Sequence, residues 1–145
     1  MHADKELLEA FAQEIREISD ILGPTAERLK IHYMAHPKLF EEFGQVIDRI
    51  YGTAATFELM EIANYCRAIK HVTYQCAQSD NTYARGQVKD LALGAVPIVK
   101  KMADVIHDPV QLKTIKFAMQ KEQKRAEELS NRLFGTNRKG PASAA

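Results

Sequence analysis

From residue 39 to residue 57 the chain reads Leu-Phe-Glu-Glu-Phe-Gly-Gln-Val-Ile-Asp-Arg-Ile-Tyr-Gly-Thr-Ala-Ala-Thr-Phe. Its apolar residues recur at steps of three and four, a spacing that places them along one side of a helix. They are Leu39, Phe40, Phe43, Ile47, Ile50, Ala54 and Phe57. The other side carries Glu41, Gln45, Asp48, Gly52 and Ala55. The stretch therefore predicts an amphipathic helix with one side in a core and the other at a surface.

Apolar stripes with the same spacing occupy most of the remaining chain. They run over residues 7–22, 59–76, 88–106 and 112–133. Amphipathic helices joined by short loops predict an all-α fold, here an antiparallel four-helix bundle with one or two additional helices. We expect residues 1–135 to form this bundle and residues 136–145 to be a disordered C-terminal tail.

Glycine and proline mark the places where these helices are expected to bend or stop. Gly23-Pro24 interrupts the first stripe, so either a kink or a new helix is expected there. Gly94 and Pro97 lie inside the fourth stripe, which we expect to be bent or broken.

Two polar segments predict where helices begin. Residues 78–82 form a polar loop that holds candidates for a helix N-cap. Asp108-Pro109 predicts a further start, with the aspartate as the N-cap and the proline in the first helical position.

The charge balance argues against several functional classes. The 145 residues include 20 basic and 19 acidic side chains, which gives a formal charge of +1 and no broad electrostatic attraction for DNA or RNA. No apolar run approaches the roughly 18 residues of a membrane span, and residues 1–9 lack the apolar core of a signal peptide. We therefore expect a cytoplasmic protein that does not bind membranes, in which Cys66 and Cys76 stay thiols.

Gly52 is the unusual residue on the polar side of the quoted helix. A glycine inside a helix costs about 1 kcal/mol relative to alanine, and packing does not require it on an exposed side. Together with Ala55 it leaves a bare stretch of helix beside the carboxylate of Asp48, where another protein can approach closely. The alternative is that Gly52 packs against a neighbouring helix.

Residues 46–70 resemble the signature of histidine-containing phosphotransfer domains. That family's pattern is His-x-Leu-Lys-Gly-Ser-Ala-x-x-Phe/Leu-Gly, followed by Leu-x-x-Leu/Ile-Ala-x-x-Cys/Leu-x-x-Leu on the next helix. The matching positions are Ile50, Gly52, Thr53, Ala54, Phe57, Leu59, Ile62, Ala63, Cys66 and Ile69. The resemblance implies the bundle fold of that family.

Three departures from the family pattern affect the chemistry. Asp48 stands where the phosphorylated histidine is expected, Tyr51 replaces the usual lysine, and Glu58 replaces the glycine at the helix junction. A phosphohistidine relay needs an imidazole nitrogen as its nucleophile, and the cation that helps to hold the phosphoryl group is missing as well. We therefore expect a pseudo-phosphotransfer domain that is not an enzyme and needs no cofactor or metal.

The resemblance also implies the partners and the binding surface. Phosphotransfer domains dock a receiver domain of a response regulator, or a histidine kinase, over the helix face that carries the histidine. The corresponding residues are Gln45, Asp48, Arg49, Tyr51, Gly52 and Ala55, flanked by Arg67 and Lys70. Occupying such a partner would make the protein an adaptor or inhibitor. Asp48 would oppose the acidic pocket of a receiver unless a bound Mg²⁺ compensates.

Other interpretations remain open at this stage. An active phosphotransfer protein could use a different histidine, although His71 has Gln75 where a small residue would be expected one turn later. His32 and His36 share a helix face and could form half of a metal site, but Arg28 on that face opposes a cation. A structural module that forms a homodimer through the Gly52 surface is a further alternative.

Overall fold

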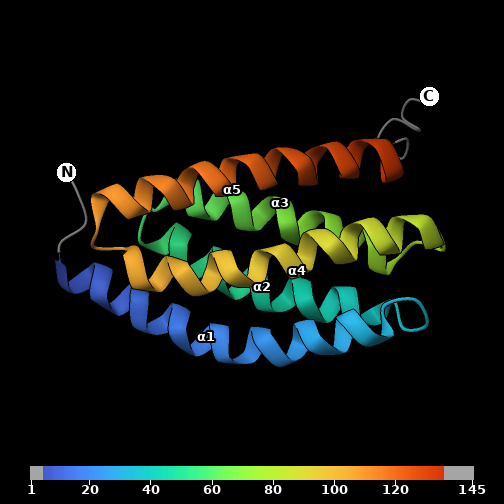
Figure 1. Ribbon diagram of the computed structural model, residues 1–145, viewed down its shortest axis with the longest axis horizontal. Helices are drawn as coiled ribbons and strands as arrows, with labels where there is room; N and C mark the ends of the chain where they lie inside the picture. The colour runs from blue at the N-terminus through green and yellow to red at the C-terminus, as the bar shows by residue number, and fades with distance from the viewer. Residues whose placement is uncertain (1–4, 136–145) are drawn as a thin grey trace.

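The computed structural model describes residues 5–135 of the chain, which form five long helices packed side by side (Figure 1). The elements are α1 (Lys5–His32), α2 (Lys38–Thr56), α3 (Met60–Ala77), α4 (Thr82–Val105), α5 (Pro109–Leu129) and a π-helical turn (Ser130–Phe134). No strand occurs among these residues, so the prediction of an all-α bundle is confirmed. The predicted tail, residues 136–145, lies outside the described residues.

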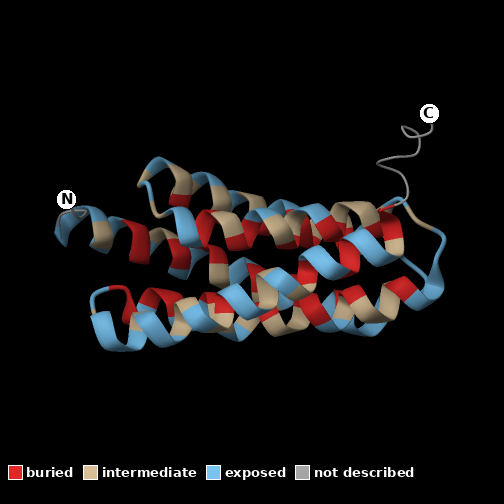
Figure 2. Cartoon of the chain, turned by 90° about the horizontal axis from the view of Figure 1, so that it is seen from above, coloured by how far each residue is buried: buried red, intermediate tan, exposed pale blue. Residues whose placement is uncertain are grey.

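The five helices close into a ring around one core. α1 packs against α2 and α4, α3 packs against α2 and α5, and α4 completes the ring against α5. The apolar stripes face inward, as the buried residues in Figure 2 show. Phe11, Phe40, Phe43, Ile47 and Ile50 have no exposed surface at all. The spacing that predicted the helices therefore also predicted which side of each helix is buried.

The predicted helix starts are confirmed in their local geometry. The side chain of Asn81 accepts a hydrogen bond from the backbone N–H of Ala84, which caps α4. The carboxylate of Asp108 accepts bonds from the N–H groups of Val110 and Gln111, with Pro109 at the start of α5. Each cap satisfies donors that the first helical turn leaves without a partner.

The expected interruptions at proline do not divide the helices. α1 continues through Gly23-Pro24, so the expectation of a new helix at that point is wrong. α4 is likewise unbroken across Gly94 and Pro97. Both prolines are exposed, and water can therefore hydrogen-bond the carbonyl groups that a helical proline leaves without a donor.

Gly44 sets how closely α2 and α3 approach, and these two helices have the most extensive contact in the bundle. A Cβ at Gly44 would lie 2.6 Å from Oγ1 of Thr73 and 2.6 Å from Cε1 of Tyr74. No side chain fits there without displacing its neighbours. Gly44 is therefore the glycine that packing requires, a role the sequence analysis considered only for Gly52.

The turn between α2 and α3 reverses the chain within three residues. The N–H of Leu59 donates to the carbonyl of Ala54, and the N–H of Glu58 donates to that of Ala55, a Schellman arrangement. Glu58 occupies the left-handed position of this turn with φ 63°. Glycine adopts that conformation without steric cost, so Glu58 introduces local strain.

We predict that Gly44→Ala destabilises the protein although alanine is the better helix former. Overpacking a tight seam costs about 1–3 kcal/mol, which outweighs the helix propensity gained. Gly52→Ala is the matched control, because a Cβ at Gly52 meets nothing within 4 Å and should stabilise the helix by about 1 kcal/mol. Urea unfolding of both variants measures the difference. Equal stabilisation by the two substitutions would contradict a packing role for Gly44.

We also predict that Glu58→Gly stabilises the protein by about 1 kcal/mol, because it relieves the left-handed strain of a residue with a Cβ. The control is Glu27→Gly at an exposed helical position of α1, which should cost about 1 kcal/mol. Thermal unfolding of the two variants should therefore move in opposite directions. A loss of stability in Glu58→Gly would show that the carboxylate contributes more than the backbone strain removes.

Candidate functional site

The polar side of α2 forms a real surface of the bundle. Gln45 and Gly52 are exposed, and Asp48 and Ala55 are half-buried. A Cβ added to Gly52 would meet no atom within 4 Å, so this glycine does not pack against another helix. The alternative of a packing role for Gly52 is therefore wrong, and the bare stretch of helix beside Asp48 is open to a partner.

Asp48 does not stand alone on this surface. Its Oδ1 lies 2.9 Å from Nζ of Lys70, which reaches across from α3. The side chains are 46% and 28% exposed, respectively, so the ion pair lies at the edge of the α2–α3 seam. Tyr51 stands where the phosphotransfer pattern has lysine, and the cation beside Asp48 comes from the neighbouring helix instead, as Lys70, which the sequence had placed at the flank of this surface.

Two tyrosines flank the same ammonium group. Nζ of Lys70 lies 5.3 Å from the ring centroid of Tyr51 and 5.9 Å from that of Tyr74. Both distances are within the range of a cation–π contact. Asp48, Lys70, Tyr51 and Tyr74 thus make one group, which we call the Asp48 cluster. The sequence analysis assigned three of them to the candidate surface and missed Tyr74, which lies one helical turn after Lys70.

The Asp48 cluster affects the pKa of Tyr74. Desolvation by the surrounding protein is the main cause that raises the pKa of the Tyr74 phenol, and the negative charge of Asp48 raises it further. Lys70 acts in the opposite direction, and Glu41 adds a smaller upward effect. The phenol is therefore neutral at physiological pH and keeps its hydroxyl proton.

The two arginines of the predicted surface behave differently. Nη2 of Arg49 lies 3.4 Å from Oε2 of Glu14, so Arg49 is paired with α1. Arg67 is exposed on α3, where its guanidinium donates to Oδ1 of Asn64 at 2.9 Å. Arg67 therefore remains the basic group beside the Asp48 cluster, whose own carboxylate and ammonium charges offset each other.

The histidines do not assemble a recognisable reactive site in the described chain. His32 and His36 are exposed, with ring centroids 5.8 Å apart, and residues 5–135 hold no group of three or more side chains suited to bind a metal. His71 is exposed on α3. Nε2 of His107 lies 3.1 Å from Oε1 of Glu9, which connects the α4–α5 turn to α1.

The cysteines are poor nucleophiles. Cys66 and Cys76 are buried free thiols, and burial raises the pKa of each to about 12. A thiol must ionise to react or to bind a metal, so both act as apolar core residues.

Comparison with known proteins adds no relative: no protein-family model, curated protein or solved structure matches this chain. Across residues 5–135, no helix has the length and apolar character needed to cross a membrane.

We predict that Asp48→Asn lowers the pKa of Tyr74, because it removes a nearby negative charge, whereas Lys70→Met raises it by removing a positive one. Ring signals of ¹³C-labelled tyrosine followed through a pH titration measure both changes. Asp104→Asn, an exposed carboxylate on α4, is the control and should leave the value unchanged. Each cluster variant should cost less than about 1 kcal/mol of stability, since the pair is partly exposed. Identical Tyr74 titrations in all three variants would contradict the cluster.

Proposed function

We propose that this protein is a non-catalytic adaptor or inhibitor that binds a partner protein through the α2 surface around Asp48. The observation that carries the proposal is the open helix backbone at Gly52, one turn from an ion-paired carboxylate. A glycine there weakens the helix and fills no packing need, so its benefit is close approach by another chain. Glycine at a contact lets a partner's side chains reach the helix backbone.

The local chemistry supports binding over phosphotransfer. The position that resembles the phosphorylated histidine holds the carboxylate of Asp48, which is already hydrogen-bonded to Lys70. A phosphohistidine relay requires an imidazole, and Asp48 does not supply one. The protein would act by occupying a partner, with no group transferred.

The backbone of the α2–α3 turn supports the family resemblance. Glu58 stands where the family pattern has glycine, and it adopts the left-handed conformation that glycine favours. The glycine of the pattern, Gly52, lies on the accessible side of α2, and the alanine of the pattern, Ala54, is buried in the core. These features favour a phosphotransfer-like scaffold whose reactive residue has been replaced.

Charge on the surface supports a receiver domain of a response regulator, or a histidine kinase, as the partner. An isolated Asp48 would repel an acidic pocket, but Lys70 offsets its charge at 2.9 Å. Arg67 then adds a positive charge at the edge of the surface. An acidic partner would therefore meet a neutral cluster with a basic flank, in the cytoplasm where such signalling proteins act.

The test is a titration of the ¹⁵N-labelled protein with receiver domains and kinase domains from the same genome. We predict chemical-shift changes at Gln45, Asp48, Gly52 and Ala55, and a loss of binding in Gly52→Leu because the side chain blocks close approach. Gly94→Leu on α4 is the matched control, since a Cβ there also meets nothing within 4 Å. Asp48→Arg should abolish binding through a changed charge without disturbing the core.

Two results would contradict this function. Unchanged affinity in both Gly52→Leu and Asp48→Arg would remove the surface from the interface. Shifts at Gly52 that depend on protein concentration, in the absence of any partner, would assign the same surface to a homodimer.

A further inference from the structure

The helices of this bundle differ in length, and the difference leaves a hollow at one end. α1 has 28 residues and α2 has 19, which correspond to about 42 Å and 28 Å of helix. The α1–α2 and α3–α4 connections lie together at one end of the bundle (Figure 1). The shorter length of α2 therefore shows at the opposite end, where α2 turns into α3. There the first turns of α1 and α5 extend past the α2–α3 turn.

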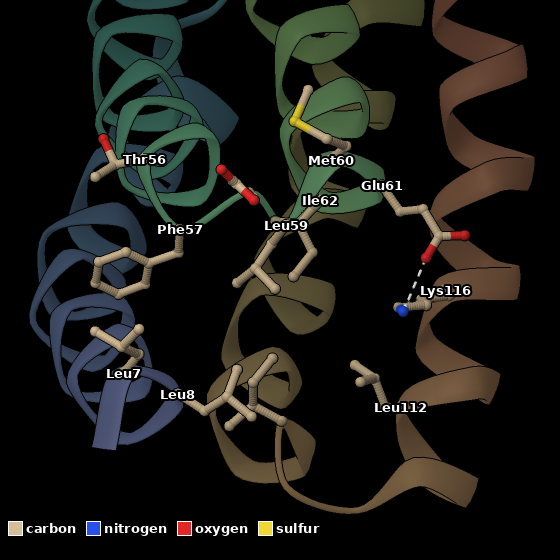
Figure 3. A pocket seen from close by; sticks show the side chains of 12 residues that line it. Leu7, Leu8, Thr56, Phe57, Leu59, Met60, Glu61, Ile62, Leu112 and Lys116 are labelled. Carbon is tan, nitrogen blue, oxygen red and sulfur yellow. Dashed lines mark ion pairs between the residues drawn. The ribbon is translucent and has the colours of Figure 1, made fainter. Parts of the chain in front are cut away.

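The resulting hollow, which we call the end bay, has a volume of about 920 Å³ (Figure 3). Eight of its twelve lining residues are apolar. Ile62 and Ile106 are buried, and Leu8 and Leu112 are half-buried. Leu7 and Met60 are 46% and 51% exposed. The bay thus exposes large apolar side chains next to a hollow, a combination that marks binding surfaces.

The charged residues that line the bay are unevenly paired. Oε1 of Glu61 lies 2.8 Å from Nζ of Lys116, so these two side chains satisfy each other across α3 and α5. Glu58 is exposed and has no ion-pair partner within residues 5–135. One negative charge is therefore left over beside an apolar hollow, and the complementary ligand carries a positive one.

We propose that the end bay binds an amphipathic helix of a partner protein, one that presents large apolar side chains and an adjacent lysine or arginine. The end bay lies beyond the α2–α3 turn, between the first turns of α1 and α5. A helical segment of a partner placed there would occupy the space that a longer α2–α3 hairpin would fill. Its size is at the upper limit for small-molecule sites, which run to roughly 1,000 Å³. The apolar side chains fill the hollow in the helix-in-groove manner, and the basic residue pairs with Glu58.

This site lies beyond the α2 surface around Asp48, along the same helix. Thr56 at the edge of the end bay is eight residues, about 12 Å, from Asp48, and its Oγ1 donates to the carbonyl of Gly52 at 2.9 Å. The inference does not depend on the proposed function, because the residues inside the bay are not those of the α2 surface.

The test uses the ¹⁵N-labelled full chain and a synthetic amphipathic helix of about 15 residues, long enough to be partly helical, with leucine on one face and lysine on the other. A second peptide of the same leucine pattern carries glutamate in place of lysine. We expect saturable shifts at Leu8, Leu59, Met60 and Leu112 with the lysine peptide, and about tenfold weaker binding of the glutamate peptide. In the Glu58→Gln variant, the affinities for the two peptides should differ by less than tenfold.

Matched methionine variants locate the binding. Met60→Glu at the rim should abolish it, whereas Met34→Glu should not, because Met34 is a similarly exposed methionine, 46%, at the other end of the bundle. Both positions are on the surface, so both variants should fold.

Several outcomes would overturn the inference. These are the absence of saturable shifts at the bay, equal binding of the two peptides, and equal effects of the two methionine variants. Bay shifts that depend on protein concentration alone would assign the bay to a second copy of this chain. Bay shifts with dodecylammonium but not with the peptide would assign it to a small amphiphile. None of these results would alter the shifts expected at Gly52.

Discussion

The close approach of α2 and α3 at Gly44 is the constraint on which the candidate site depends. Thr73 and Tyr74 of α3 lie where a side chain at Gly44 would otherwise stand. Lys70 is one helical turn before Tyr74, and Asp48 is one turn after Gly44. The tight seam therefore brings Lys70 within 2.9 Å of Asp48 and sets both tyrosines around the ammonium group. A wider separation of the two helices would leave an uncompensated carboxylate on the surface.

The same hairpin explains why the end bay lies at one end only. At the opposite end Arg85 donates to the carbonyl of Met34 at 2.7 Å and to that of Ser79 at 3.1 Å. One side chain of α4 thus holds the α1–α2 and α3–α4 connections together, and the helices are aligned there. Because α2 and α3 are the short pair, the mismatch in length appears entirely at the α2–α3 turn. The hollow is a consequence of helix lengths and needs no special loop.

The sequence predicted what depends on local spacing and missed what depends on register between helices. Periodicity identified the helices and their buried sides. Side-chain chemistry identified Asp108 as a cap and placed another within residues 78–82, where Asn81 caps α4. Gly44 was missed although it lies on the apolar side of α2, because a glycine has no side chain to place in a stripe. The pairing of Asp48 with Lys70 spans 22 residues, and no local pattern fixes which residues of two helices face each other. The effect of Pro24 was overestimated because tertiary packing kept α1 continuous.

The residues that stabilise the fold differ from the residues of the proposed binding surface. A half-exposed ion pair contributes less than about 1 kcal/mol, whereas burying a single phenylalanine contributes about 1.5–3 kcal/mol. Stability therefore rests on the ring of buried apolar side chains, and the Asp48 cluster is close to neutral for the fold. Gly52 and Glu58 even oppose folding slightly, one by helix propensity and the other by backbone strain. Folding does not account for residues that lower stability at an accessible surface, whereas the proposed binding would account for them. Both lie on the α2–α3 hairpin, which carries the surface of the proposed function and the edge of the end bay.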